Sequence, residues 1–280
     1  MSAIGTRSKD SVAIASKPIS FSFGKNWKKY LAGLDESNVR DAMNNFCNFT
    51  QLSDLKGESF IDLGCGSGLN SLVAYRLGAK TIVSVDVDQH SVECAKELRD
   101  RMAPDAQSWR VLQGSVLDAD FLKKLGQFSY VYCWGVVHHT GAMWRALENI
   151  IQCVQPSGKL HVAIYNEHKN SAKWLQIKRL CNKYPTTIFP LLKLALATYV
   201  CGHLVYEGQS PIRYLREYNK NRGMKFWRDI EDWLGGLPYE YCKPDQAIDF
   251  LSQQGFALVR LKATTFIGCN EFLFRAEGRP

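Results

Sequence analysis

Three glycines spaced two residues apart form the most informative pattern in this sequence. Gly64, Gly66 and Gly68 follow the apolar run 60–63 and precede the helix-like run 69–77. Glycine lets a backbone approach a ligand closely and adopt positive φ angles, and the amides at a helix start favour an anionic group. The spacing is tighter than the G-x-G-x-x-G of dinucleotide-binding loops, where a pyrophosphate rests on the helix. The loop therefore predicts a site for a smaller polar ligand end, such as an amino-acid carboxylate.

An acidic residue at the end of the next apolar run supports this interpretation. Asp86 ends the run TIVSVD (81–86) and follows Gly66 by 20 residues. In nucleotide-binding proteins, a carboxylate at such a strand end accepts hydrogen bonds from the hydroxyls of a ribose. The alternative is a glycine-rich turn that only permits tight helix–strand packing, and it leaves the acidic residue unexplained.

Two adjacent histidines are candidates for acid–base chemistry. His138 and His139 follow the apolar run 128–134, and Tyr165 and Asn166 stand at the end of a later run. Ligands of open α/β sheets bind at the carboxyl ends of the strands, and imidazole titrates near neutral pH, which suits a general base. Either histidine could take a substrate proton, with Tyr165 and Asn166 orienting the substrate or supplying another base. The competing interpretation is that these side chains only shape the loops.

The pattern of the whole chain predicts a scaffold that brings these strand ends together. Strand-like and helix-like runs alternate between residues 40 and 165, which is typical of a parallel sheet with crossover helices. The expected strands are 59–63, 81–85, 109–113, 128–134 and 159–165, and the expected helices are 39–49, 69–77, 89–101, 119–125 and 143–154, with a turn at 156–158. A helix at 245–254 and strands at 256–263 and 270–276 end the chain, and these strands are close enough to pair antiparallel. We predict an α/β fold with a seven-stranded, mostly parallel sheet, a C-terminal antiparallel hairpin and a helical cap inserted after the fifth strand.

The same pattern divides the chain into four parts. We expect an N-terminal tail and lid (1–38), a cofactor-binding core (39–165), a helical substrate cap (166–244) and a C-terminal helix with strands that complete the core (245–280). The cap is rich in aromatic residues, which suits an apolar or ring-containing ligand. Its basic residues form either a solvent-exposed helix face or a binding surface for a phosphate or a nucleic-acid backbone.

The bulk composition limits the function classes. The chain has 280 residues and a formal net charge of +8, which favours an anionic partner without requiring one. The nine cysteines are well separated and form no CxxC, which disfavours zinc fingers and a disulfide framework. Residues 1–14 lack the apolar stretch of a secretory signal. We therefore expect a cytoplasmic protein with reduced thiols.

One apolar segment, residues 188–205, approaches the length of a membrane span. Pro190, Lys193, Gly202 and His203 interrupt it. We interpret it as one or two cap helices and expect no transmembrane span, with weak contact to a membrane surface as the alternative. The pattern predicts no particular oligomeric state.

Five motifs in this order resemble the class I S-adenosylmethionine-dependent methyltransferases. They are FIDLGCGSGLNSL (60–72), SVDVD (84–88), GSVLD (114–118), YVYCWGVVHHT (130–140) and VQPSGKLHVAIYN (154–166). The resemblance covers residues 57–165 and the final hairpin, and the motif order is closest to the ubiquinone-biosynthesis-like and small-molecule methyltransferase branch. It implies a Rossmann-like fold and an enzyme that uses S-adenosyl-L-methionine as its cofactor.

The resemblance also implies roles for individual residues. Asp86 would bind the ribose, and Trp134 and Gly135 would border the methionine part, with a core tryptophan as the competing interpretation of Trp134. Trp27 or Tyr30 would stack over the cofactor, with simple packing as the alternative. Ser115 stands where many members have Asp, so the adenine contact would fall to backbone groups near Val116. The implied cofactor-binding residues are Trp27, Asp62, Gly64, Cys65, Gly66, Gly68, Asp86, Val87, Ser115, Val116, Trp134 and Gly135. No metal is expected, because metal-dependent relatives carry carboxylate clusters where this chain reads WGVVHHT.

The leading interpretation is methyl transfer to a hydroxyl or nitrogen of a small-molecule metabolite, such as a sugar, polyketide, quinol or modified peptide. The predicted catalytic residues are His138, His139, Tyr165 and Asn166. The long cap differs from the compact ubiquinone enzymes, which disfavours a quinone substrate. The basic cap makes an RNA methyltransferase the alternative, although no N-P-P-Y-type motif follows the fourth strand. A non-catalytic cofactor-binding scaffold is a third interpretation, which the intact glycine loop and Asp86 disfavour.

Overall fold

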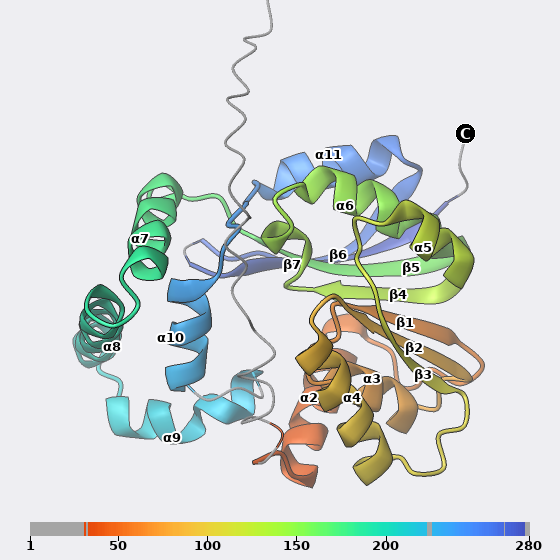
Figure 1. The fold of residues 1–280 in the computed structure, drawn as a ribbon, viewed down its shortest axis with the longest axis horizontal. Helices are drawn as coiled ribbons and strands as arrows, with labels where there is room; N and C mark the ends of the chain where they lie inside the picture. The colour runs from red at the N-terminus through yellow and green to blue at the C-terminus, as the bar shows by residue number, and fades with distance from the viewer. Residues whose placement is uncertain (1–30, 32, 223–225, 266, 278–280) are drawn as a thin grey trace, which may run out of the picture.

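Seven strands form one mixed sheet in the computed structural model, which describes residues 31, 33–222, 226–265 and 267–277 (Figure 1). The strand order is β3-β2-β1-β4-β5-β7-β6. The strands are β1 (Ser59–Leu63), β2 (Thr81–Asp86), β3 (Trp109–Gln113), β4 (Phe128–Trp134), β5 (Val154–Tyr165), β6 (Phe256–Lys262) and β7 (Cys269–Ala276). β1 to β5 pair in parallel, and β7 pairs antiparallel with both β5 and β6. The predicted Rossmann-like fold with a C-terminal antiparallel hairpin is confirmed.

Helices cover both faces of this sheet (Figure 1). One face carries α2 (Glu36–Thr50), α3 (Leu69–Arg76) and α4 (Gln89–Met102), and the other carries α5 (Ala119–Leu125), α6 (Met143–Ile150) and α11 (Pro244–Gln253). Asp35, Asp88 and Asp118 precede α2, α4 and α5, and their carboxylates accept hydrogen bonds from amides of the first turn. These caps satisfy amides that have no partner within the helix, so the sequence itself sets where the helices begin.

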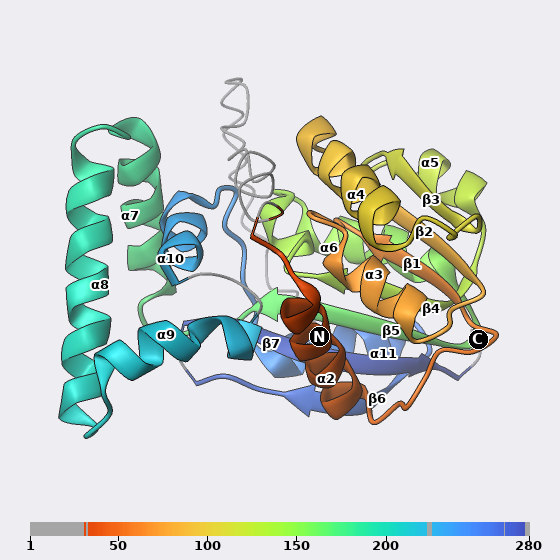
Figure 2. The same cartoon turned by 90° about the horizontal axis from the view of Figure 1, so that it is seen from below.

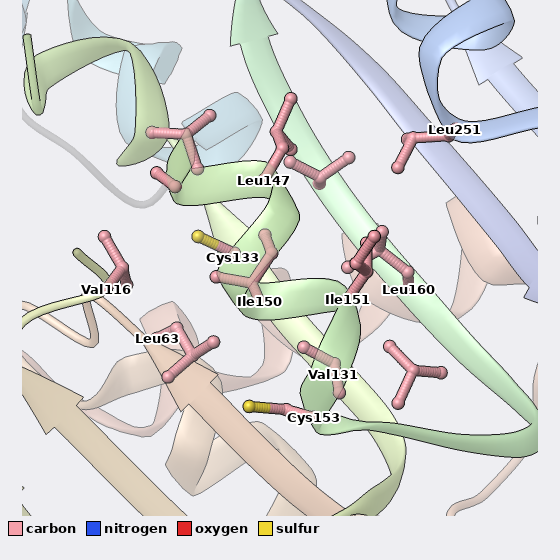
Figure 3. Close-up of a cluster of buried hydrophobic side chains, with 14 of the residues drawn as sticks. Leu63, Val116, Val131, Cys133, Leu147, Ile150, Ile151, Cys153, Leu160 and Leu251 are labelled. Atoms are coloured by element: carbon pink, nitrogen blue, oxygen red, sulfur yellow. The ribbon is translucent and has the colours of Figure 1, made fainter. Parts of the chain in front are cut away.

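The core between β4, β5 and the helices α6 and α11 is closely packed (Figure 3). Val131 and Leu160 from the strands meet Leu147 and Ile150 from α6, and each of these side chains is fully buried. Burying one such side chain contributes roughly 1.5–3 kcal/mol relative to leaving it exposed. This packing keeps the ends of the strands, which carry the site residues, in fixed positions.

The start of β5 differs from the prediction. The expected helix 143–154 ends at Ile150, a short 3-10 turn follows at Ile151–Cys153, and β5 begins at Val154. The turn expected at 156–158 lies inside β5, where the pairing with β4 shifts register between Phe128 and Tyr130. This irregularity accommodates Pro156 and the positive φ angle of Ser157, so the strand continues through both residues.

Four helices connect β5 to α11: α7 (Ser171–Lys183), α8 (Ile188–Tyr206), α9 (Pro211–Arg222) and α10 (Phe226–Gly235). They stand beside the sheet at the carboxyl end of β5 (Figure 1). They share a small apolar core with Cys181, Ala197, Ile230 and Leu234 at its centre. α9 reaches back along the sheet to α2, so the cap also packs against the helical layer of the core (Figure 2).

The apolar segment predicted as one or two cap helices is the single helix α8. Among the residues that the structure describes, it is the one helix whose length and composition would suit a membrane span. Its inner side packs against α7 and α10, and only 11% of its most apolar window is buried. α8 is therefore a wall of the cap with one face turned outward.

Candidate active site

A cavity of about 2070 Å³ lies where the carboxyl ends of the parallel strands face the cap. Its core half is lined by residues 64–67, 69–70, 86–88, 91, 114–117 and 134–135, and its cap half by side chains from α8, α9, α10 and the 237–238 loop. His138, His139 and Tyr165 lie between the two halves. Small-molecule sites usually occupy roughly 300–1,000 Å³, so this cavity has room for two ligands side by side.

The glycine loop in the core half is shaped by steric limits. Gly64 has φ of +79°, and a Cβ built on it would lie 2.2 Å from a methyl carbon of Val136. Gly68 has φ of +82°, and a Cβ there would lie 3.0 Å from the Cβ of Ala95 on α4. Left-handed backbone and close approach both demand glycine, so the loop can take this path only with these residues.

Asp86 joins the glycine loop to the end of β2. One carboxylate oxygen accepts a hydrogen bond from the Gly66 amide at 2.9 Å, and the other accepts one from the Asp88 amide at 2.9 Å. Burial raises the pKa of this carboxyl group. An ionised carboxylate has about four acceptor positions, so Asp86 can still accept hydroxyl groups from a ligand in the cavity.

Most residues predicted to bind the cofactor line the core half. These are Gly64, Cys65, Gly66, Asp86, Val87, Ser115, Val116, Trp134 and Gly135. Trp134 is 36% exposed and donates a hydrogen bond from its indole to Glu271, so it is a wall of the cavity and not a core residue. Trp27 and Tyr30 lie outside the described residues.

The structure does not bring Asp62 or Gly68 to the cavity surface. The Asp62 carboxylate is 2% exposed and accepts a hydrogen bond from the Ser71 hydroxyl at 2.7 Å. Ser71 in turn bonds Ser84 at 2.6 Å, which accepts the indole proton of Trp109. Burial raises the pKa of Asp62 to about 7. Asp62 therefore ties α3 to the sheet behind the glycine loop.

The hydrogen bonds of the two histidines give them different tautomers. His138 Nδ1 accepts the backbone N–H of Tyr165 at 3.2 Å, so in the neutral ring Nε2 carries the proton. His139 Nδ1 donates to the carbonyl oxygen of Pro238 at 2.7 Å, so Nε2 is its unprotonated nitrogen. Burial lowers the pKa of His138 well below its usual range and that of His139 to about 4. Both rings are therefore neutral at pH 7, one able to donate and the other to accept through Nε2.

A loop of the cap fixes the position of His139. The ring lies beneath Gly236, where a Cβ would come within 2.8 Å of its Cε1 atom. Two residues after Pro238, the backbone N–H of Glu240 donates to the carbonyl of His138 at 2.9 Å, and its carboxylate accepts the Met143 amide. No local pattern indicated this contact, because it joins segments about 100 residues apart in the chain.

The two remaining predicted catalytic residues occupy different positions. Tyr165 lines the cavity, with its ring centroid 3.8 Å from that of His138, and burial raises its pKa far above the usual range. Asn166 is not at the cavity surface. Its side-chain oxygen accepts from Asn270 at 3.0 Å, and its backbone pairs with Cys242. Asn166 therefore holds together β5, β7 and the end of the cap.

Sequence reasoning missed a buried lysine beside the site. Lys178 on α7 is fully buried and donates to the carbonyl of Trp233. Its ammonium nitrogen lies 4.2 Å from the ring centroid of Trp233, 4.8 Å from Tyr239 and 5.8 Å from Tyr165. Burial lowers its pKa to about 7. On a helix with other basic residues, nothing in the sequence distinguishes Lys178 from a solvated lysine.

The described residues contain no group of three or more His, Cys, Asp and Glu side chains that could hold a metal ion. The core half has features that fit a nucleoside with an amino-acid end: a steric cradle of glycines, amides at the start of α3, and Asp86 at the strand end. It is the part of the cavity that S-adenosylmethionine would occupy.

Comparisons with known proteins agree with this geometry. The model of a family described as a methyltransferase domain matches residues 36–228. A ribosomal protein L11 methyltransferase of Thermotoga neapolitana is 50% identical over 42 residues, which are 15% of this chain and 16% of that protein. The chain therefore matches this curated relative over only about a sixth of the relative's length.

Two solved structures show the same fold. Magnesium protoporphyrin IX methyltransferase of Synechocystis PCC 6803, with bound SAH, has a TM-score of 0.53 and 13% identity, covering 91% of this chain and 94% of that one. An O-methyltransferase family protein from Burkholderia thailandensis has a TM-score of 0.56 and 12% identity, covering 94% and 65%.

Proposed function

The chain belongs to the methyltransferase-domain family, and from that premise we propose that it transfers a methyl group from S-adenosylmethionine to a hydroxyl or nitrogen of an apolar, ring-containing small molecule. The observation that carries the proposal is the composition of the cap half. Its lining includes Tyr199, Tyr214, Tyr218, Phe226 and Trp233. Aromatic side chains of this kind are typical walls of sites for flat or apolar ligands. The core half would hold the cofactor, and the acceptor would lie against these rings.

S-adenosylmethionine, when bound, supplies a methyl carbon that the acceptor atom attacks in line with the departing sulfur. The glycine loop and Asp86 orient the cofactor end of this arrangement, and the aromatic walls of the cap orient the acceptor. Holding both partners in a reactive geometry can contribute roughly 7–11 kcal/mol to lowering the barrier.

We assign the proton transfer to His139. Its Nε2 is the unprotonated nitrogen, because Nδ1 donates to Pro238. The pKa of about 4 keeps the ring neutral at physiological pH, so it can accept the proton that the acceptor releases. His138 has the opposite tautomer and can donate a hydrogen bond to the acceptor.

The first test is binding of the cofactor, measured by calorimetric titration with S-adenosylmethionine and S-adenosylhomocysteine. We expect wild-type protein to bind both, and Asp86→Ala to lose affinity by about 10- to 100-fold, because it removes hydrogen bonds to a charged acceptor. Asp120→Ala is the matched control, since Asp120 is an exposed residue of α5 outside this cavity. Wild-type protein that binds neither compound would overturn the assignment of the core half.

The second test concerns the acceptor. Wild-type protein is incubated with methyl-labelled cofactor and one of a panel of phenols, aromatic amines, sugars or RNA. Transfer to the aromatic compounds supports the proposal. Transfer to RNA alone would instead show that the basic residues of the cap grip a nucleic-acid backbone, and transfer to sugars alone would contradict an aromatic-lined acceptor site.

A further inference from the structure

The two faces of α8 meet different surroundings. An α-helix has 3.6 residues per turn, so residues three or four apart share a face. Leu196, Val200 and Leu204 face inward and line the cavity. The opposite face is an outer stripe of exposed residues: Leu191, Leu194, Ala195, Thr198, Gly202, Val205 and Tyr206. The helix is thus apolar on both sides, but among the residues that the structure describes only the inner side meets a partner.

The outer stripe is large and without charge. Leu191 is 68% exposed, Leu194 62%, Val205 63% and Tyr206 88%. Leu180 and Tyr184 on α7 and Ile212 on α9 are also exposed, and both helices contact α8. Soluble proteins rarely leave such contiguous apolar patches open to water unless the patch binds something. Figures 1 and 2 both place α8 at the outer edge of the cap, away from the sheet.

The surroundings of the outer stripe are strongly basic. Among residues 169–218, from the start of the cap into α9, the one exposed acidic side chain is Glu207, whereas six basic side chains are exposed: Lys169, Lys173, Arg179, Lys183, Arg213 and Arg216. Arg179 and Lys183 are exposed on α7 beside Leu180 and Tyr184, and Arg213 and Arg216 are exposed on α9 beside Ile212. An apolar stripe bordered by Lys and Arg is typical of helices that lie in the interface of an anionic membrane.

We propose that the outer stripe of α8 docks this protein on the surface of an anionic phospholipid bilayer, with the helix lying in the plane of the interface. The leucines, Val205 and Tyr206 would enter the boundary between headgroups and acyl chains, while Arg179, Lys183, Arg213 and Arg216 contact the phosphates. α8 does not span the bilayer in this arrangement, because its inner face lines the cavity.

Charge distinguishes a bilayer from a second copy of the chain as the partner. In a twofold dimer each patch meets its own equivalent, so the basic borders of two copies would face one another and repel. An anionic lipid surface attracts the same residues, each Lys or Arg adding to the binding. The proposal does not depend on which acceptor is methylated.

The test is flotation of the full-length protein with two kinds of vesicle, phosphatidylcholine alone and phosphatidylcholine mixed with phosphatidylglycerol. We expect binding to the mixed vesicles that weakens as salt is added. Leu194→Glu with Val205→Glu should lower this binding by at least about tenfold, because two aliphatic contacts are lost and two like charges are brought to the lipid. Neither residue lines the cavity, so cofactor affinity should not change.

The matched control is Leu258→Glu with Val259→Glu. These residues are a leucine and a valine on β6 that are 37% and 51% exposed, outside the cap. The control should float like the wild type, and equal cofactor binding by both variants shows that both are folded. Three results would overturn the proposal: no wild-type binding to mixed vesicles, equal loss in the control, or a wild-type dimer that only the α8 variant dissociates.

Discussion

Different kinds of contact stabilise the core half and the cap half of the cavity. In the core half, Gly66 bonds Asp86 across 20 residues of one strand–loop–helix–strand unit. In the cap half, His139 bonds Pro238 across 99 residues, and Lys178 bonds the Trp233 carbonyl across 55. Local backbone sterics therefore specify the core half, whereas the cap half exists only when the cap has packed on the core. The two halves should respond differently to mutation and to pH.

The largest effect is expected at the junction of the halves. His139→Ala removes the proposed base, so turnover should fall by about 10²–10⁴-fold. Affinity for S-adenosylhomocysteine should stay within error of the wild type, because His139 is held by the cap loop and not by the glycine loop. Steady-state rates with an active acceptor and calorimetric titration measure the two quantities separately.

His138→Ala is the companion variant. It leaves the Tyr165 amide without its acceptor and removes an Nε2 donor, so it should lower turnover by less than His139→Ala. The reverse order, or loss of cofactor affinity in both variants, would show that the histidines shape the core half and that the assignment of the base is wrong. The ionisation of His139 should leave kcat/KM of the wild type constant above pH 5. As the pH approaches 4, the ring becomes protonated and can no longer act as a base, so kcat/KM should fall.

A second prediction concerns the core half alone. Gly64→Ala must force a Cβ into the side chain of Val136, so the loop has to move, and cofactor affinity should fall by about 100-fold. Gly57→Ala tests the conformational strain by itself: Gly57 has φ of +80°, but a Cβ there meets nothing within 4 Å. It should destabilise the fold by about 1 kcal/mol without weakening binding. Equal affinities for the two variants would mean that the shape of the loop does not define the site.

The difference between the halves also explains what could be predicted from the sequence. Apart from the junction of α6 and β5, strand and helix limits in the core agree closely with the structure, because caps such as Asp88 and Asp118 and short apolar runs act within a few residues. The roles of Asp86 and the glycines were inferred for the same reason. Asp62 shows where such inference fails. Its place in the motif predicts a contact with the cofactor, yet its side chain points toward Ser71. Motif spacing locates a backbone and not the direction of a side chain.

The cap half could not be predicted in this way. The sequence indicated an aromatic, helical insertion, but it did not indicate that Pro238 would fix the tautomer of His139 or that Lys178 would lie among three rings. Those positions follow from how four helices pack, which no local pattern encodes. The exposure of α8 has the same origin, since an apolar run is equally compatible with a buried helix and an exposed one.

A third prediction uses the buried charge of the cap half. The pKa of Lys178 falls from 10.5 to about 7 on folding, so between pH 7 and pH 10.5 the unfolded chain binds more protons than the folded one. The free energy of unfolding should therefore rise with pH in this window, with a slope of at most about 1.4 kcal/mol per pH unit from this residue. Urea unfolding of the wild type and Lys178→Met between pH 7 and pH 9 measures it, and the slope should be smaller in the variant. Identical slopes would show that Lys178 is solvated.

The last prediction has the opposite sign and belongs to the core half. Burial raises the pKa of Asp62 from 3.8 to about 7, so between these values the unfolded chain loses its proton while the folded chain keeps it. The free energy of unfolding should therefore fall as the pH rises from 4 to 7, again by at most about 1.4 kcal/mol per pH unit. Asp62→Asn keeps an acceptor for Ser71 and cannot ionise, so it should reduce this slope and leave the slope above pH 7 in place. The whole effect is slightly smaller than that of Lys178, because the shift from 3.8 to about 7 is narrower than the shift from 10.5 to about 7. If Asp62→Asn changed the slope above pH 7 as well, the two halves would titrate as one unit, and the distinction between them would fail.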